Sequence, residues 1–572
     1  MKGLKKTLSM LLVLALILSL LSACGNGSGE DVSAVSSADV LAQSAAEVQE
    51  PPAAELESNA EVNAAESASE PEIASISYPI ADGAVLTSWG SMNANLTNYM
   101  ESLSDNSVIK RASEITGVTL ETTSVSSDSV SDQFALMIAA GDYTDFIDNI
   151  SSFYGSNASA IEDGVIVDLS GYVQEYAPDY YAELSTNESW LRFATTDEGY
   201  MPLFCQLTRN ANTLLDSGYL IRQDWLDELN LDVPTTTDEL HDVLVAFQTE
   251  KNASAPMWYN SNGLGLIAEA YGACALYEPM GGFYPFYVID DTVYCGYQSD
   301  SFKEYLKTAA QWYEEGLIWK DFVSDTFCFG ISTSNALSLF TNDNMGVAYG
   351  EMTDITAIPS QANGNMVLTA MPDPTRDGAV NHLTSVDAGI GYKHGISTNC
   401  EDVELACKYI NFFYTEEGYD LCTYGVENEG FVYDDNGDKQ YTELITDNPD
   451  GLGYDNAFDI YCLMDFSCIV NGARKLQIYD EDSLAASEVW AASRDGAYIY
   501  PKGAALTAEE SSEFNGIFTD LNTYVNESVL SFITGGKDVD AEWDAFQEQI
   551  VNLGAEDALQ LKVDAYNRYI SR

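Results

Sequence analysis

The sequence predicts an α/β fold, because segments with the periodicity of strands and of helices alternate along its folded part. Residues 85–87 have the composition of a strand, and residues 96–103 repeat apolar side chains at helical spacing. Residues 118–122 then alternate like a half-buried strand, residues 134–140 are helical, and residues 146–147 begin another strand. This order is typical of an open sheet covered by helices, in which ligands bind beyond the carboxyl ends of the strands.

A second unit begins near residue 215, where a strand-like run leads into a helix. Residues 219–222 form the strand and residues 223–229 the helix, on whose apolar face Trp225 is predicted to be a core residue.

Two later helices have clear starting signals. Thr236 and Glu239 have the spacing of a capping box, and near the C-terminus Asp538 or Asp540 can cap a helix that ends at Gly554.

The N-terminus has the pattern of a secretory signal. Lysines precede an apolar run over residues 11–21, which is shorter than the roughly 20 residues of a membrane-spanning helix. Residues 21–24, Leu-Ser-Ala-Cys, resemble a bacterial lipobox. The resemblance implies a signal peptide over residues 1–23, a diacylglyceryl group on Cys24, and a lipid anchor at the extracytoplasmic face of the cell membrane. The alternative is an ordinary signal peptide that has a cysteine nearby.

Residues 24–77 are predicted to be the lipidated cysteine and a disordered tether. Residues 25–76 contain eleven acids but no Lys, Arg or aromatic residue. Repulsion between like charges extends such a segment, which has too few apolar side chains to form a core. We therefore expect the folded part to begin near residue 78.

The charge of the chain excludes one class of partner. Its 572 residues include 24 Lys plus Arg against 90 Asp plus Glu, a formal charge of −66. Nucleic-acid binding requires clustered cations that neutralise phosphates, so we expect no nucleic-acid partner. The negative field also favours neutral or cationic ligands over anionic ones.

No motif for catalysis, a metal or a cofactor stands out. The three histidines lack metal-ligand spacing, and nine cysteines beyond Cys24 contain no CxxC pair, so we expect free, mostly buried thiols. Residues 434–438, Asp-Asp-Asn-Gly-Asp, only partly match a calcium loop, and a hairpin turn between Tyr433 and Tyr441 is predicted instead. We predict no enzyme activity, metal or cofactor.

Seven motifs occur in the order found in a known family. Beside the lipobox they are residues 140–145 (Ala-Gly-Asp-Tyr-Thr-Asp), 221–227 (Ile-Arg-Gln-Asp-Trp-Leu-Asp), 233–236 (Val-Pro-Thr-Thr), 424–430 (Tyr-Gly-Val-Glu-Asn-Glu-Gly), 535–538 (Gly-Gly-Lys-Asp) and 565–569 (Ala-Tyr-Asn-Arg-Tyr). The chain thereby resembles the extracellular solute-binding proteins of bacterial ABC importers, in the oligosaccharide-binding group close to the LplA-type lipoproteins. Thr144 departs from the family, which often has Pro there.

The resemblance implies a two-lobed periplasmic-binding-protein-like fold over residues 78–572, with a hinge and an interlobe ligand cleft. The first lobe would hold about 78–210 and 383–428, and the second about 215–375 and 429–572. The hinge would lie near residues 214–222 and at two later crossings, and a monomer is expected.

Sugar binding combines aromatic rings, which stack on the C–H faces of pyranoses, with polar groups that pair with hydroxyls. The chain is rich in rings, with 8 Trp, 35 Tyr and 22 Phe. The candidate ligand-binding residues are Trp89, Asp142, Trp258, Tyr259, Glu351, Met352 and Glu427. Each also has an ordinary structural interpretation, as a core aromatic, a capping group or a solvated carboxylate.

These observations predict a lipid-anchored binding protein that captures an oligosaccharide and delivers it to ABC permease subunits. One alternative is a lipid-anchored glycan hydrolase, which needs two carboxyl groups roughly 5 to 9.5 Å apart. Another is a binding protein for a peptide or other polar solute.

Overall fold

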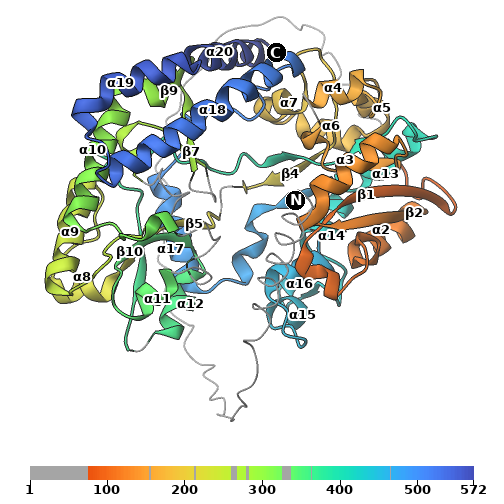
Figure 1. Ribbon diagram of the computed structural model, residues 1–572. Coiled ribbons are helices and arrows are strands. Elements are labelled where there is room, and N and C mark those ends of the chain that lie inside the picture. The colour runs from red at the N-terminus through yellow and green to blue at the C-terminus, as the bar shows by residue number, and fades with distance from the viewer. Residues whose placement is uncertain are drawn as a thin grey trace, which may run out of the picture. The chain divides into compact units, whose positions relative to one another are not determined.

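The chain divides into two units, Met1–Glu70 and Pro71–Arg572, and the computed structural model describes only residues of the second (Figure 1). The described residues are 75–153, 156–211, 214–258, 267–277, 282–324, 331, 336–362, 364–463 and 466–572. The predicted signal peptide, Cys24 and tether lie outside them. Within this part of the chain, no helix combines the length and apolarity needed to cross a membrane.

The first lobe is built on a four-stranded sheet. Its strands are β1 (Ala84–Met92), β2 (Val118–Ser126), β3 (Phe146–Ile147) and β13 (Gly395–Ile396), in the order β13–β3–β1–β2. β1 is parallel to β2 and β3, and β13 is antiparallel to β3. β1 extends beyond the predicted end at Thr87, so Trp89 lies inside the strand rather than after it.

Helices and one hairpin complete the first lobe. They are α2 (Ser107–Thr116), α3 (Val130–Ala140), α4 (Asn157–Glu162), α5 (Val173–Tyr176), α6 (Pro178–Leu184), α7 (Glu188–Ala194), α13 (Val403–Phe412), α14 (Glu416–Tyr424), α15 (Glu443–Thr446), α16 (Tyr454–Tyr461), β14 (Phe431–Tyr433) and β15 (Lys439–Tyr441). The side chain of Asn106 caps α2 by accepting from the N–H groups of Val108 and Ile109. The antiparallel pairing of β14 and β15 confirms the predicted hairpin.

The second lobe has an antiparallel sheet in the order β10–β5–β11, from β5 (Ser217–Arg222), β10 (Val347–Glu351) and β11 (Leu368–Met371). Two hairpins accompany it, β6 (Ala275–Tyr277) with β7 (Gly282–Tyr284) and β8 (Phe286–Ile289) with β9 (Thr292–Cys295). Its helices are α8 (Gln223–Leu229), α9 (Thr237–Glu250), α10 (Asp300–Glu315), α11 (Ala336–Thr341), α12 (Asp354–Gln361), α17 (Glu481–Ser493), α18 (Ala508–Ile533), α19 (Val539–Asn552) and α20 (Ala555–Ser571).

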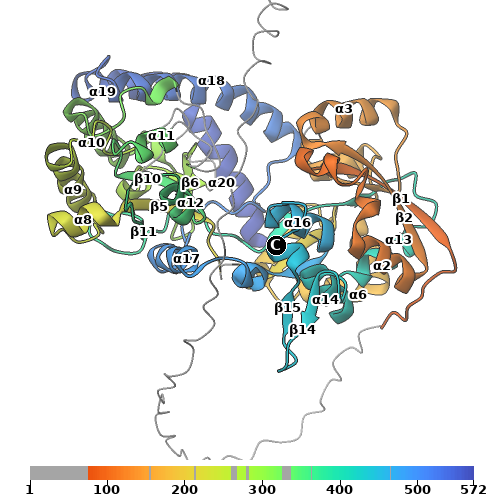
Figure 2. The same ribbon diagram turned by 90° about the horizontal axis from the view of Figure 1, so that it is seen from below.

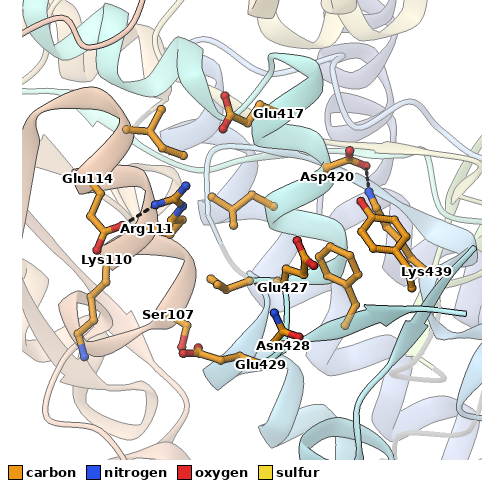
Figure 3. Close-up of a pocket in the computed structure, with 16 residues that line it drawn as sticks. Ser107, Lys110, Arg111, Glu114, Glu417, Asp420, Glu427, Asn428, Glu429 and Lys439 are labelled. Atoms are coloured by element: carbon orange, nitrogen blue, oxygen red, sulfur yellow. Dashed lines mark hydrogen bonds and ion pairs between the residues drawn. The ribbon is translucent and has the colours of Figure 1, made fainter. Parts of the chain in front are cut away.

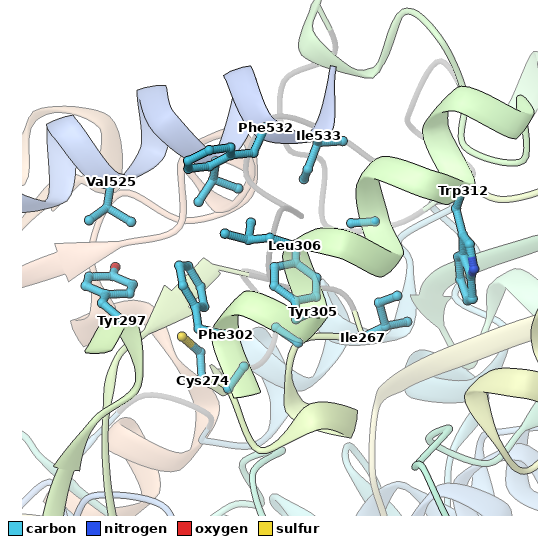
Figure 4. Packing of buried hydrophobic residues seen from close by; sticks show 14 of the residues in the cluster. Ile267, Cys274, Tyr297, Phe302, Tyr305, Leu306, Trp312, Val525, Phe532 and Ile533 are labelled. Atoms are coloured by element: carbon cyan, nitrogen blue, oxygen red, sulfur yellow. The ribbon is translucent and has the colours of Figure 1, made fainter. Parts of the chain in front are cut away.

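The second lobe's core confirms several sequence signals. Figure 4 shows Phe302 of α10 and Phe532 of α18 in this apolar cluster. Trp225 is buried in the same cluster, as predicted. Thr236 begins α9 with a complete capping box, and Asp538, rather than Asp540, caps α19.

A third sheet joins the lobes. It has the order β12–β4–β16 and consists of β4 (Cys205–Arg209), β12 (Ile390–Tyr392) and β16 (Ile469–Asn471). The chain passes from β4 to β5, returns from β11 to β12, and leaves again from β16 to α17. The three crossings, 210–216, 372–389 and 472–480, form the hinge expected of a two-lobed fold.

One lobe boundary differs from the expectation. Residues 429–470 pack with the first lobe, not the second: Phe466 and Ile469 belong to its core, and Asn106 Nδ2 donates to the carbonyl oxygens of Asp459 and Cys462 at 2.8 and 2.7 Å. Figure 2 shows α16, β14 and β15 beside α14 and α2. The apolar residues of this segment complete the first core, so the boundary lies in the third crossing.

The cysteines of the described part agree with the prediction of free thiols. Eight are present, and all are free and buried: Cys205, Cys274, Cys295, Cys400, Cys407, Cys422, Cys462 and Cys468.

Candidate functional site

A pocket of about 290 Å³, here called the hinge pocket, lies where β10 ends beside the first and third crossings. Its lining residues come from both lobes and from the crossings between them. They include Asp216, Glu351, Met352, Tyr454, Lys475 and Tyr479.

Backbone and side-chain hydrogen bonds hold the end of β10 in place. Met352 N donates to the carbonyl oxygen of Asp216 at 2.8 Å, which ties the strand to the first crossing. Ser483 Oγ of α17 donates to the carbonyl oxygen of Met352 at 3.2 Å. Glu351 N donates to the buried Asp354 carboxylate at 3.1 Å. Glu351 and Met352 therefore project from a backbone that three other segments fix.

The chemistry of the hinge pocket suits a polyhydroxylated ligand. The rings of Tyr454 and Tyr479 meet edge to face with centroids 5.2 Å apart. Asp216, Glu351 and Lys475 supply groups that accept from or donate to hydroxyls. Rings beside a few polar groups are the usual composition of a small-ligand site.

One buried arginine, just after the end of α17, connects the second-lobe ends of the first two crossings. Arg494 follows α17, and its Nη2 donates to Oδ1 of Asp373, just after β11, at 2.8 Å, while Nε lies 2.7 Å from Oδ2. Nη1 donates to the carbonyl oxygen of Ser217, the first residue of β5, at 3.2 Å. Both charged side chains are fully buried. This ion pair anchors the hinge to the second lobe.

A buried acid lies in the same region. Burial, and to a smaller extent the charge of Asp373, raises the pKa of Glu269 to about 8. Tyr219 Oη donates to Glu269 Oε1 at 3.1 Å. No cluster of three or more His, Cys, Asp or Glu suited to a metal ion occurs in the described residues.

The structure brings only Glu351 and Met352, of the seven predicted ligand-binding residues, into the hinge pocket. Met352 is 1% exposed. Tyr259 lies outside the described residues.

Two predicted tryptophans are core residues in this structure. Trp89 is 7% exposed and packs against Phe134 at a centroid distance of 5.9 Å. Trp258 is 4% exposed, and its backbone N–H donates to the carbonyl oxygen of Val347 at 2.9 Å. Neither ring presents an open face for stacking here.

The two remaining predicted acids are exposed. Asp142 follows Gly141, which ends α3, whereas Asp145 nearby accepts hydrogen bonds from N and Oγ1 of Thr87, both at 2.7 Å. Glu427 lines a different pocket, of about 720 Å³, between α2, α14 and the β14–β15 hairpin (Figure 3).

Sequence reasoning missed Asp216, Tyr454, Lys475 and Tyr479. These residues lie in three separate parts of the chain, with Lys475 and Tyr479 together on the third crossing, so no local spacing connects all four. The only available signal is that Asp216 lies three residues before the predicted strand of residues 219–222.

Comparisons with known proteins agree with this arrangement. The profile of the family described as bacterial extracellular solute-binding protein matches residues 100–420. The fructooligosaccharide ABC transporter substrate-binding protein FusA of Streptococcus pneumoniae is 22% identical over 497 residues, 81% of this chain and 87% of FusA. The polygalacturonan/rhamnogalacturonan-binding protein YtcQ of Bacillus subtilis is 23% identical over 350 residues, 58% of this chain and 65% of YtcQ.

A solved structure shares the fold over nearly its whole length. It is an HMO-binding, ABC-transporter-associated solute-binding protein from Bifidobacterium longum infantis, and it superimposes with a TM-score of 0.68 at 20% identity. The match covers 85% of this chain and 99% of that one.

Proposed function

Because the chain belongs to the bacterial extracellular solute-binding proteins, we propose that it captures an oligosaccharide outside the cell and delivers it to an ABC transporter. The observation that carries the proposal is the hinge pocket, whose rings, carboxylates and lysine come from both lobes and from two crossings. The names of FusA and YtcQ, which specify oligo- and polysaccharides, support the same ligand class.

A ligand that contacts both lobes stabilises the arrangement in which both sets of contacts are made. It shifts the population toward that arrangement by the difference in its affinity for the open and closed states. The three crossings are the segments that absorb such a movement. Permease subunits can recognise the bound state because binding changes the relative position of the two lobe surfaces. This signal needs no catalytic step.

Delivery requires that the protein stay near its transporter. We assign this role to a diacylglyceryl anchor on Cys24 and to the acidic tether that follows it. Palmitate labelling of the full-length protein, with Cys24→Ser as the control, tests the assignment. Label that persists in the variant would overturn it.

The function is tested by calorimetric titration of residues 71–572, a compact unit by itself, with a panel of neutral and acidic oligosaccharides. Products are analysed after each titration. We expect saturable binding with the sugar recovered unchanged. Cleaved sugar would establish a hydrolase instead. A folded protein that binds no saccharide would contradict the proposal, and peptides would then be titrated.

A further inference from the structure

A third pocket, of about 540 Å³, here called the aromatic pocket, differs from the hinge pocket in its charge. Its walls include Tyr284, Tyr392, Tyr500, Lys502, Phe514 and Lys562. Two of its lining residues are lysines. Among the residues that the structure describes, no Asp or Glu lines this pocket. This is unexpected in a chain with 90 acids against 24 basic residues, and the hinge pocket itself has Asp216 and Glu351.

The ammonium group of Lys562, on α20, is enclosed by rings. Its Nζ lies 4.6 Å from the ring centroid of Phe514, 5.2 Å from that of Tyr500, and 6.0 Å from those of Tyr284 and Phe286. In the described part of the chain, no carboxylate forms an ion pair with it. Ring faces attract a cation, but they replace only part of the hydration that it loses.

Burial lowers the pKa of Lys562 to about 8. Near neutral pH most molecules therefore still carry this charge, which is partly removed from water and has no counter-ion. A carboxylate that entered the pocket would gain an ion pair with an ammonium that is already partly desolvated. It would also displace no acidic side chain, because none lines the pocket.

We propose that the aromatic pocket binds a uronate, a sugar residue with a carboxylate, as one unit of the captured oligosaccharide. The inference rests on the proposed function and names its ligand class. Lys562 pairs with the carboxylate, the neighbouring rings stack on the pyranose, and Lys502 adds a second cation at the exposed edge. A wholly neutral sugar would leave this partly buried cation unpaired.

The pocket is also placed to contribute to closure. Asn157 of α4 and Tyr392 of β12 come from the first lobe and the connecting sheet, whereas Tyr500, Phe514 and Lys562 come from the second. A uronate there contacts both sides of the hinge. The local charge thus reverses the expectation, drawn from the charge of the whole chain, that anionic ligands are disfavoured. The global field slows the approach of an anion and is screened by salt, while the contact energy is set within the pocket.

The decisive experiment changes only the charge of the ligand. Residues 71–572 are titrated with trigalacturonate, triglucuronate and trimannuronate, with the methyl ester of each, and with a neutral panel of galactose, glucose, mannose and fructose oligomers. We expect at least one acid to bind ten or more times tighter than its own ester. Esters that bind as well as their acids, or binding confined to neutral sugars, would overturn the inference and leave the proposed function standing. If no saccharide binds, both fail.

A matched pair of variants locates the effect. Lys562→Met is expected to abolish the preference for acid over ester, and Lys562→Arg to retain it. Lys537→Met is the control, because Lys537 also faces two rings, at 5.6 Å (Tyr524) and 5.7 Å (Phe532), but does not line the pocket. Thermal unfolding checks folding, and Lys562→Met should not lower the melting temperature, since it removes a partly buried charge that has no ion-pair partner. A preference that survives Lys562→Met in the folded protein would place the uronate elsewhere.

Discussion

At the scale of single residues, the buried Arg494–Asp373 pair is expected to contribute strongly to stability. Arg494→Ala would leave the Asp373 carboxylate buried without a partner, which typically costs about 3–5 kcal/mol. Urea unfolding measures the loss in the free energy of unfolding. The control is Arg192→Ala, because Arg192 pairs with the exposed Glu188 on α7 and its loss should cost about 1 kcal/mol or less. Similar costs for the two variants would mean that Arg494 does not anchor the hinge.

A second residue-scale prediction concerns a glycine in β5. A Cβ at Gly218 would lie 2.4 Å from the indole of Trp490, which is fully buried. Gly218→Ala therefore overpacks the contact between β5 and α17, and we expect a loss of about 1–3 kcal/mol. Gly516→Ala is the matched control, because Gly516 lies inside α18 with open space around its Cβ position. That change should stabilise the protein by roughly 0.5–1 kcal/mol. Differential scanning calorimetry distinguishes the two signs.

At the scale of elements, the segment between β12 and β13 contains a buried histidine that makes stability depend on pH. His394 is 3% exposed, its Nδ1 lies 2.9 Å from Ser467 Oγ, and burial lowers its pKa to about 4. The charges of Asp148 and Lys393 act on it with opposite signs. In the unfolded chain this histidine becomes protonated below about pH 6.5. In the folded chain it stays neutral until the pH falls to about 4.

The folded state therefore loses stability at His394 as the pH falls from about 6.5 to 4, by up to about 3 kcal/mol. Urea unfolding gives the free energy of unfolding of His394→Gln and of the unmodified protein at pH 4.5 and at pH 7.5. We expect the difference between the two proteins to favour the variant more at pH 4.5 than at pH 7.5. Because the comparison is a difference, the titration of other buried groups cancels. An identical difference at the two pH values would show that His394 is protonated in both states or in neither.

Most elements with a local signal could be predicted from the sequence. The exception is the helical spacing of residues 96–103, where the structure has only the short 3-10 helices Ala94–Asn98 and Leu103–Asp105. The capping box of α9, the β14–β15 hairpin and the buried face of α8 depend on residues close in the chain, and all are found. The length of β1 was underestimated because Ser88 and Gly90 interrupt its apolar pattern. Both are accommodated there because the strand is central, between β2 and β3.

The candidate site shows the same division between local and long-range information. Glu351 ends β10 and Met352 follows it, and both could be proposed from this position together with the family resemblance. Tyr454 and Tyr479 are brought to them only by the hinge, which assembles segments more than a hundred residues apart. Trp89 and Trp258 were proposed because exposed rings bind sugars, but a ring's direction is set by tertiary packing.

At the scale of the whole molecule, the hinge couples ligand contacts to a movement of the lobes. Tyr479 lies on the third crossing and packs edge to face on Tyr454 of the first lobe, in a pocket that also contains Glu351 of the second. Tyr479→Ala removes this contact, and we expect about a 3- to 10-fold weaker affinity for the oligosaccharide, the loss of roughly 0.5–1.5 kcal/mol typical of an aromatic contact. Tyr433→Ala is the control, because Tyr433 is exposed and lines the pocket of Glu427 instead.

The accompanying movement is measured by small-angle X-ray scattering. Saturating oligosaccharide should decrease the radius of gyration of the unmodified protein, because a ligand that contacts both lobes favours the closed arrangement. Tyr433→Ala should respond at the same sugar concentrations, whereas Tyr479→Ala should require a concentration higher by the same factor by which its affinity falls. A radius of gyration that stays constant while calorimetry shows saturation would mean that this chain binds its ligand without closing. The transporter would then have to recognise the bound sugar itself rather than a change in the position of the lobes.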